Sequence, residues 1–304
     1  MINSWTSIIG AFAVSLAASF WAFEAVVLMP YLYDLPTLFV VFILHALPFL
    51  VMQFFFYKQY KYLKILSKKD LFFFVLLAIS GGILGTYCIT KALFLMNFQQ
   101  LTIVALLQKL QPIFAIILAR FFLGEKIKKE NIFWILLAIL SSYFLSFGFQ
   151  TPEHAENNVV QAVIFSVLAA FFYGSQTVWG KKAIEKVPPI TGTFYRLGFT
   201  TFILGFFLIF QSDFWENFSK ITFLHAEIFA IIGLFSSGLG LTLYYFGLKK
   251  IKANVATICE MMYIVSAVFF DYLLHKTQLS WPQIISAFIL VFSIYRLSSK
   301  KRKK

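Results

Sequence analysis

Charge is scarce in this sequence. Asp, Glu, Lys and Arg make up 13% of its 304 residues, about half of the quarter that is usual in a soluble domain. Hydrophobic residues make up 60%, and 40 of them are Phe. A fold surrounded by water would have to expose much of this apolar surface as adhesive patches. The composition therefore excludes an ordinary soluble protein and predicts one whose solvent is lipid.

Cysteine and histidine are also rare. Cys88 and Cys259 lie inside apolar stretches, where we expect small packing residues and neither a disulfide framework nor a zinc motif. The four histidines are scattered along the chain. A membrane-embedded enzyme, which stays open as an alternative, would need clustered acid, base or metal-binding groups. We therefore expect no catalytic residue, no metal and no cofactor.

Two further functional classes find little support. No phosphate-binding loop of the P-loop type occurs, which argues against transport driven directly by ATP. A channel-like pore would need a filter-like polar or glycine run, or a ring of charge, and the sequence has none. The channel is kept as a second alternative to a carrier.

Apolar stretches of about 20 residues, the length that crosses a bilayer, follow one another along nearly the whole chain. They are continuously apolar and do not alternate as barrel strands do, so we predict an all-α integral membrane fold. The start of the chain lacks a basic segment before its first apolar run, so we read that run as a retained helix. The ten predicted spans are 5–29, 36–57, 71–96, 101–123, 131–149, 158–180, 190–211, 223–248, 254–274 and 281–298.

The positive charges predict the orientation of these spans. The net charge is +13, but the basic residues lie between the spans and form no single patch, so we expect no nucleic-acid partner. Most fall in alternate connections, at 58–69, 120–129, 181–186, 249–252 and 296–304. Because cytoplasmic loops carry the excess of Lys and Arg, both termini are predicted to be cytoplasmic, in a bacterial inner membrane.

The chain also contains an internal repeat. A shift of 152 residues, half the length, aligns the apolar segments without a gap and brings Pro36 onto Pro188 and Gly81 onto Gly233. The predicted domains are therefore 1–152 and 153–304, each with five helices. Because five is odd, the second half must enter the membrane from the opposite side. Inverted repeats of this kind are typical of secondary transporters, which favours a carrier over an enzyme.

Two sets of residues carry a resemblance to a known family. The stretch LTIVALLQKLQPIFAIILARFFLGEK, residues 101–126, has a mid-helix Pro112 and ends in Gly124 and Glu125. It resembles the fourth helix of EamA-type transporters of the drug/metabolite transporter superfamily. The stretches SLAASFWAFEAV and VLAAFFYGSQTV resemble that family's first and sixth helices, at Trp21-Ala22 and Tyr173-Gly174.

The resemblance covers the whole chain and implies ten helices, alternating access and a central cavity lined by both halves. Pro112 would act as a hinge. The second half departs from the pattern, since Ile264 stands where the first half has its proline. The sequence therefore gives no signal for an equivalent kink in the ninth span.

Ionisable residues inside the spans are candidates for function, because each costs about 2.5–3.5 kcal/mol at the bilayer centre. We single out Glu24, Lys109 and Glu260 for substrate binding. Glu24 is also the candidate for ion coupling, together with His45, which titrates near neutral pH. For the first three, a buried structural ion pair is an equal alternative, and for His45 a neutral histidine bonded within the bundle. Arg196 and Lys91 are weaker candidates, nearer to helix ends.

Aromatic residues with polar edges on the inner helices complete the predicted binding site. They are Trp21, Tyr173, Tyr244, Tyr245 and Tyr263. The mixture of acidic and basic groups indicates an amino acid-like substrate that is zwitterionic or anionic, carried by proton coupling or exchange. An organic cation or a nucleotide-type metabolite is the alternative substrate. The expected partners are thus a small molecule and the lipid bilayer, and a homodimer is left open.

Overall fold

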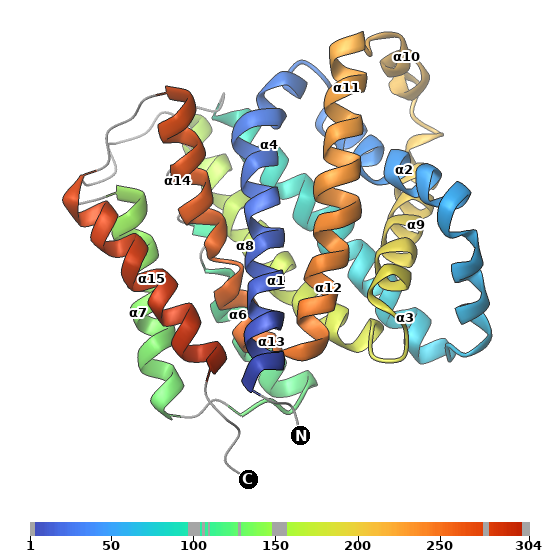
Figure 1. Ribbon diagram of the computed structural model, residues 1–304. Helices are drawn as coiled ribbons and strands as arrows, with labels where there is room; N and C mark the ends of the chain where they lie inside the picture. Colours follow the sequence, from blue (N-terminus) through green and yellow to red (C-terminus); the bar gives the residue numbers. More distant parts are fainter. Residues whose placement is uncertain are drawn as a thin grey trace.

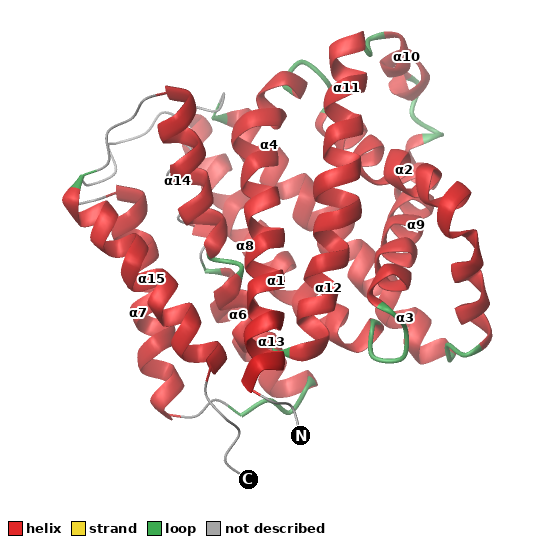
Figure 2. Ribbon diagram, viewed as in Figure 1, coloured by secondary structure: helices red, strands yellow, loops and turns green. Residues whose placement is uncertain are grey.

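The computed structural model describes residues 4–96, 104, 107–108, 110–126, 129–147, 157–275 and 280–299. All of its regular structure within these ranges is helical, without a strand (Figure 2). The first half contains α1 (Ser4–Phe23), η1 (Glu24–Leu28), η2 (Met29–Leu32), α2 (Thr37–Phe56), η3 (Tyr57–Lys64), α3 (Lys68–Leu77), η4 (Ala78–Gly85), α4 (Thr86–Leu95), α6 (Gln111–Phe122) and α7 (Lys129–Phe147).

The second half follows the same order of long and interrupted helices. It contains α8 (Asn157–Ala183), α9 (Pro189–Leu208), α10 (Asp213–Ser219), α11 (Phe223–Ile232), η5 (Gly233–Gly240), α12 (Leu241–Lys250), α13 (Ala253–Cys259), α14 (Met262–His275) and α15 (Trp281–Ser299). Segments η1, η4 and η5 are π-helical, and π turns inside α-helices are frequent at functional sites.

Six helical rods are long and apolar enough to cross a membrane: Trp5–Leu32, Thr37–Lys64, Lys68–Leu95, Val160–Ala183, Phe223–Lys250 and Ala253–Leu274. A seventh is obtained if α9 and α10, bent by 113°, form one span. Three shorter apolar helices, Gln111–Phe122, Asn131–Leu145 and Trp281–Leu297, occupy the places of the other predicted spans. The multi-pass helical architecture is thus confirmed.

The bundle has two distinct ends. α1 begins and α15 ends at the same end, the lower end in Figure 1, where α12 also stops and α13 starts. The loop from η2 to α2 and the short α10 lie at the opposite, upper end (Figure 1). α7 and α15 pair along one side of the bundle, while α1 is central and packs on both α12 and α14.

Small residues permit the closest helix crossings. A side chain on Gly247 of α12 would lie 2.4 Å from the carbonyl oxygen of Gly10 on α1, and one on Gly174 of α8 would meet the backbone of α6 at 2.9 Å. Backbones that approach this closely are the usual way to pack helices in lipid, where no hydrophobic force brings them together. Gly174, part of the family-like pattern, is therefore a packing residue between α8 and α6.

The fourth and ninth spans are both interrupted. A turn at Leu110 precedes α6, and Pro112 lies in the first turn of that helix. Proline has no backbone N–H, but the N–H groups of a first helical turn have no partner within the helix, so proline is tolerated there. The ninth span breaks at Glu260 and Met261, between α13 and α14. The ninth span therefore breaks without a proline, although Ile264 at the proline position gave no signal for a kink. Hydrogen bonds between residues three positions apart replace the α-helical bonds there. One of them runs from the Tyr263 N–H to the Glu260 carbonyl oxygen at 3.0 Å.

Gly124 and Glu125 connect this region to the other half of the chain. Gly124 has φ +63°, a left-handed conformation that favours glycine and ends α6. The Glu125 carboxylate then accepts hydrogen bonds from the backbone N–H groups of Ala253 at 2.9 Å and Asn254 at 3.2 Å. The Gly-Glu pair thus caps the first turn of α13, whose free N–H groups attract negative charge.

Candidate functional site

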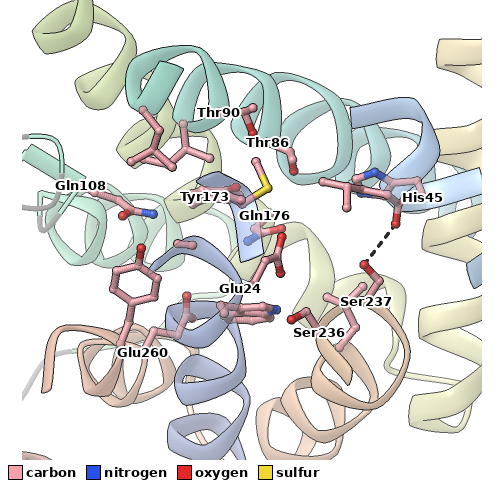
Figure 3. Close-up of a pocket in the computed structure, with 18 of the residues that line it drawn as sticks. Glu24, His45, Thr86, Thr90, Gln108, Tyr173, Gln176, Ser236, Ser237 and Glu260 are labelled. Carbon is pink, nitrogen blue, oxygen red and sulfur yellow. Dashed lines mark hydrogen bonds between the residues drawn. The ribbon is translucent and has the colours of Figure 1, made fainter. Parts of the chain in front are cut away.

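A cavity of about 140 Å³ lies inside the bundle, between the two halves of the chain. Both halves supply its lining, and the interrupted or π-helical segments η1, η5 and the α13–α14 break border it. Figure 3 shows Glu24, Tyr173 and Gln176 at its centre, with Glu260 and Gln108 on one side and His45 and Ser237 on the other. Its lining residues are Trp21, Glu24, Ala25, Met29, Leu44, His45, Thr86, Ile89, Thr90, Leu93, Gln108, Gln111, Tyr173, Gln176, Arg196, Ser236, Ser237, Leu241, Glu260 and Tyr263.

Most of the residues predicted for the site meet in this cavity. Six of them line it: Trp21, Glu24, His45, Tyr173, Glu260 and Tyr263. Tyr244 and Tyr245 do not line it, but lie fully buried directly behind its wall. Lys109 falls outside the described residues. The roles assigned to these side chains stay predictions, but their meeting place is one site.

Glu260 is held by polar neighbours at the lower side of the cavity. Gln111 donates its amide N–H to Glu260 Oε2 at 2.6 Å, and the Thr177 hydroxyl lies 3.4 Å from Oε1. The Tyr244 hydroxyl donates to Thr177 at 2.9 Å, and its ring lies 5.4 Å from that of Trp21. Tyr244 is thus a supporting residue, which explains why it is buried behind the wall.

Arg196 belongs to the same lower layer. It is 4% exposed and donates from Nη1 to the Tyr245 hydroxyl at 3.3 Å. Sequence reasoning had placed this arginine near a helix end, as a weaker candidate. The structure places it in the cavity wall instead, because α9 crosses α12 at this level and the two are joined by a Thr193–Thr242 hydroxyl contact of 3.0 Å.

His45 is buried near the middle of α2. Its Nδ1 donates to the carbonyl oxygen of Val41 in the preceding turn at 2.8 Å, because a carbonyl oxygen only accepts. His45 is therefore bonded within its own helix, and its role in coupling stays a prediction. Within the part of the chain that the structure describes, His, Cys, Asp and Glu form no group of three that could hold a metal.

Residues 152 positions apart in the sequence line the cavity in pairs. Such pairs are Trp21 and Tyr173, Glu24 and Gln176, Leu44 and Arg196, Ile89 and Leu241, Gln108 and Glu260, and Gln111 and Tyr263. Each acidic residue thus has a glutamine as its repeat counterpart. A lining built from matched pairs is what two repeats packed around a shared axis would produce.

The upper and lower boundaries of the cavity differ in chemistry. Below lie the hydrogen-bonded groups around Glu260 and Arg196, which we call the polar layer. Above, Met29, Leu44 and Leu93 line the cavity and belong to a buried apolar cluster with Leu28, Leu32 and Phe229, among others. We call the three lining residues of that cluster the apolar layer. The cavity is therefore bordered by hydrogen-bonded groups on its lower side and by packed apolar side chains on its upper side.

Neutral polar residues were missing from the predicted site. Thr86, Thr90, Gln111, Gln176 and Ser236 line the cavity but carry no charge, so the cost of burying a charge gave no signal for them. The repeat offset could have found Gln176, because it stands opposite Glu24 in the alignment of the two halves. Buried amides and hydroxyls need hydrogen-bond partners from the protein or from a ligand, so their presence in the lining indicates where a ligand can bind.

Known proteins resemble this chain over most of its length. The profile of the EamA-like transporter family matches residues 7–147 and again residues 160–299. The chain belongs to the EamA-like transporter family.

Individual relatives extend this result. The Riboflavin transporter ImpX of Fusobacterium nucleatum is 47% identical over 291 residues, covering 95% of this chain and 97% of that protein. The Uncharacterized transporter YetK of Bacillus subtilis is 26% identical and covers 78% and 71%. A solved structure titled only as a crystal structure of a protein superposes with a TM-score of 0.65 at 14% identity, covering 96% of each chain, and so shares the fold. The transporter names agree with the expectation of a small-metabolite transporter that is not an enzyme.

Proposed function

We propose that this protein is a secondary carrier for riboflavin. Riboflavin joins a flat, neutral heteroaromatic ring, with an imide edge, to a chain of hydroxyl groups. The observation that carries the proposal is the lining of the cavity, where the aromatic side chains of Trp21, Tyr173 and Tyr263 occur together with amides and hydroxyls. Aromatic walls stack on such a ring, and neutral polar groups match its edges and its hydroxyls. The name of the relative at 47% identity points to the same substrate.

The substrate class expected from the sequence rested on the charges inside the membrane. The cavity places two carboxylates, Glu24 and Glu260, with one arginine, Arg196, among a larger number of neutral groups. One of these carboxylates is already bonded to Gln111. A neutral ligand rich in hydrogen-bonding groups suits this lining better than an anion, which two acidic groups would repel.

Transport proceeds by alternating access in this proposal. The six rods, the bent α9–α10 pair and the three shorter apolar helices make ten spans, in inverted halves 1–152 and 153–304. The lower end, rich in basic residues, faces the cytoplasm of a bacterial cell. At about 140 Å³ the cavity is smaller than typical ligand pockets of about 300–1,000 Å³, so substrate entry must widen it. The interrupted spans that border the cavity are the elements able to move.

Uptake of radiolabelled riboflavin into proteoliposomes tests the proposal. We expect saturable uptake that unlabelled riboflavin inside the vesicles accelerates, and no inhibition by excess amino acids, choline or nucleotides. Trp21→Leu should raise the concentration for half-maximal uptake several-fold, since aromatic stacking is lost. Trp215→Leu is the matched control, because Trp215 is 62% exposed on α10. Linear uptake that internal riboflavin leaves unchanged would indicate a pore, and inhibition by an amino acid would restore the original substrate class.

A further inference from the structure

Arg196 stands out among the described lining residues as the one permanently charged cation. Its side chain lies in an almost fully buried position on α9, and two contacts with α12 fix its place. Thr193, one helical turn earlier, meets Thr242, and Arg196 Nη1 donates to the Tyr245 hydroxyl at 3.3 Å. Because these contacts hold the helix and one end of the guanidinium, the remaining N–H groups have a set direction.

One of these N–H groups lacks a partner. Arg196 Nε is fully buried and makes no hydrogen bond, and the side-chain oxygens of Gln108 and Gln176 in the same cavity also have none. Buried polar groups are nearly always paired, and an unpaired charged donor is among the costliest exceptions. One donor and two amide oxygens thus lack partners on side chains that line one cavity, and a ligand that widens the cavity can reach all three.

We infer that Arg196 recognises the imide edge of the substrate ring and determines specificity for it. This inference rests on the proposed function. An imide presents a carbonyl oxygen, an N–H and a second carbonyl oxygen in a row. Arg196 donates to one carbonyl oxygen, the oxygen of one of the two glutamines accepts from the imide N–H, and the other glutamine donates its amide N–H to the second carbonyl oxygen.

The repeat makes this recognition one-sided. The counterpart of Arg196 in the first half is Leu44, which also lines the cavity but offers no hydrogen bond. Glu260, the nearby acid, is already bonded to Gln111. A ring bound between the two halves therefore has a single favourable orientation, with its imide edge toward α9.

Binding to the purified full-length protein tests the inference. Quenching of flavin fluorescence gives the Kd of riboflavin, and competition gives the affinities of its 2-thio and 4-thio analogues, in which sulfur replaces a carbonyl oxygen as a weaker acceptor. The wild type should prefer riboflavin to at least one analogue by about tenfold. Arg196→Gln should weaken riboflavin binding roughly 10- to 100-fold. It should also bring the ratio of the analogue's Kd to the Kd of riboflavin close to one. Arg196→Lys, which keeps the charge but loses the Nε donor, should also lose the preference.

The ratio of affinities separates recognition from a structural role. Arg120→Gln, which changes an exposed arginine on α6, should leave the Kd and the preference unchanged. If Arg196→Lys and Arg196→Gln keep the wild-type preference, whether or not both ligands bind more weakly, Arg196 does not read the imide edge and the inference fails. If the wild type itself fails to bind riboflavin, the proposed function fails, and this inference with it.

Discussion

The carboxylate of Glu125 joins the two halves of the chain at the lower end, and its removal should measurably destabilise the protein. Glu125→Ala deletes two hydrogen bonds to the backbone of α13, of 2.9 and 3.2 Å. A lost helix cap costs about 0.5–2 kcal/mol, and a hydrogen bond to a charged group about 1.5–3 kcal/mol. Because Glu125 is only partly buried, water replaces some of the lost hydrogen bonding. We therefore expect the free energy of unfolding to fall by about 2 kcal/mol.

Thermal unfolding in detergent, followed by intrinsic fluorescence, measures this loss. At about 2–4 °C per kcal/mol for a chain somewhat smaller than this one, Glu125→Ala should lower the Tm by about 4–8 °C. Glu125→Gln, which keeps an acceptor, should lose roughly half as much. Glu216→Ala is the matched control, because its ion pair with Lys220 is exposed and contributes about 0–1 kcal/mol. An unchanged Tm in Glu125→Ala, or an equal drop in Glu216→Ala, would refute the capping role.

Three further predictions concern transport and topology. Glu260→Gln should be expressed and folded but lose at least tenfold in riboflavin flux, because the bond to Gln111 changes; normal flux would show that Glu260 is structural. Glu24→Gln should abolish accumulation driven by a pH gradient while exchange survives, if Glu24 carries the coupled proton; undiminished accumulation would rule that role out. An impermeant thiol reagent applied to intact cells should label Ser212→Cys at the upper end and spare Lys64→Cys, since basic loops stay inside; the reverse pattern would invert the topology.

The sequence predicted the helices well and their interruptions poorly. Continuous apolar stretches identify spans because every backbone group must be satisfied within lipid, and the observed rods follow the predicted ranges closely. The first span was expected to end at residue 29, but it continues to Leu32 through π and 3₁₀ turns. The break at Glu260 was missed because proline was its expected cause, whereas here polar side chains around the turn accompany it.

The candidate site was predictable where chemistry is costly. Glu24 and Glu260 were singled out because a charge inside a membrane is costly, and both line the cavity, although their roles stay predictions. Tyr244 was predicted to contact the substrate but lies buried behind the lining residues, because the sequence gives the position of a residue along a helix and not its distance from a cavity. Gln176 was missed because a glutamine in an apolar helix carries no comparable cost. Whether residues of the two halves line one cavity depends on how the halves pack against each other, and a local sequence pattern does not predict that packing.

The contrast between the polar layer and the apolar layer has a consequence for temperature. Parting Met29, Leu44 and Leu93 exposes hydrocarbon to water in the cavity, which increases heat capacity, whereas separating the hydrogen bonds around Glu260 exposes polar groups, which decreases it. Apolar association weakens on cooling. In a carrier that opens alternately through these two layers, cooling therefore favours the state open at the upper end, and warming shifts the balance toward the lower one.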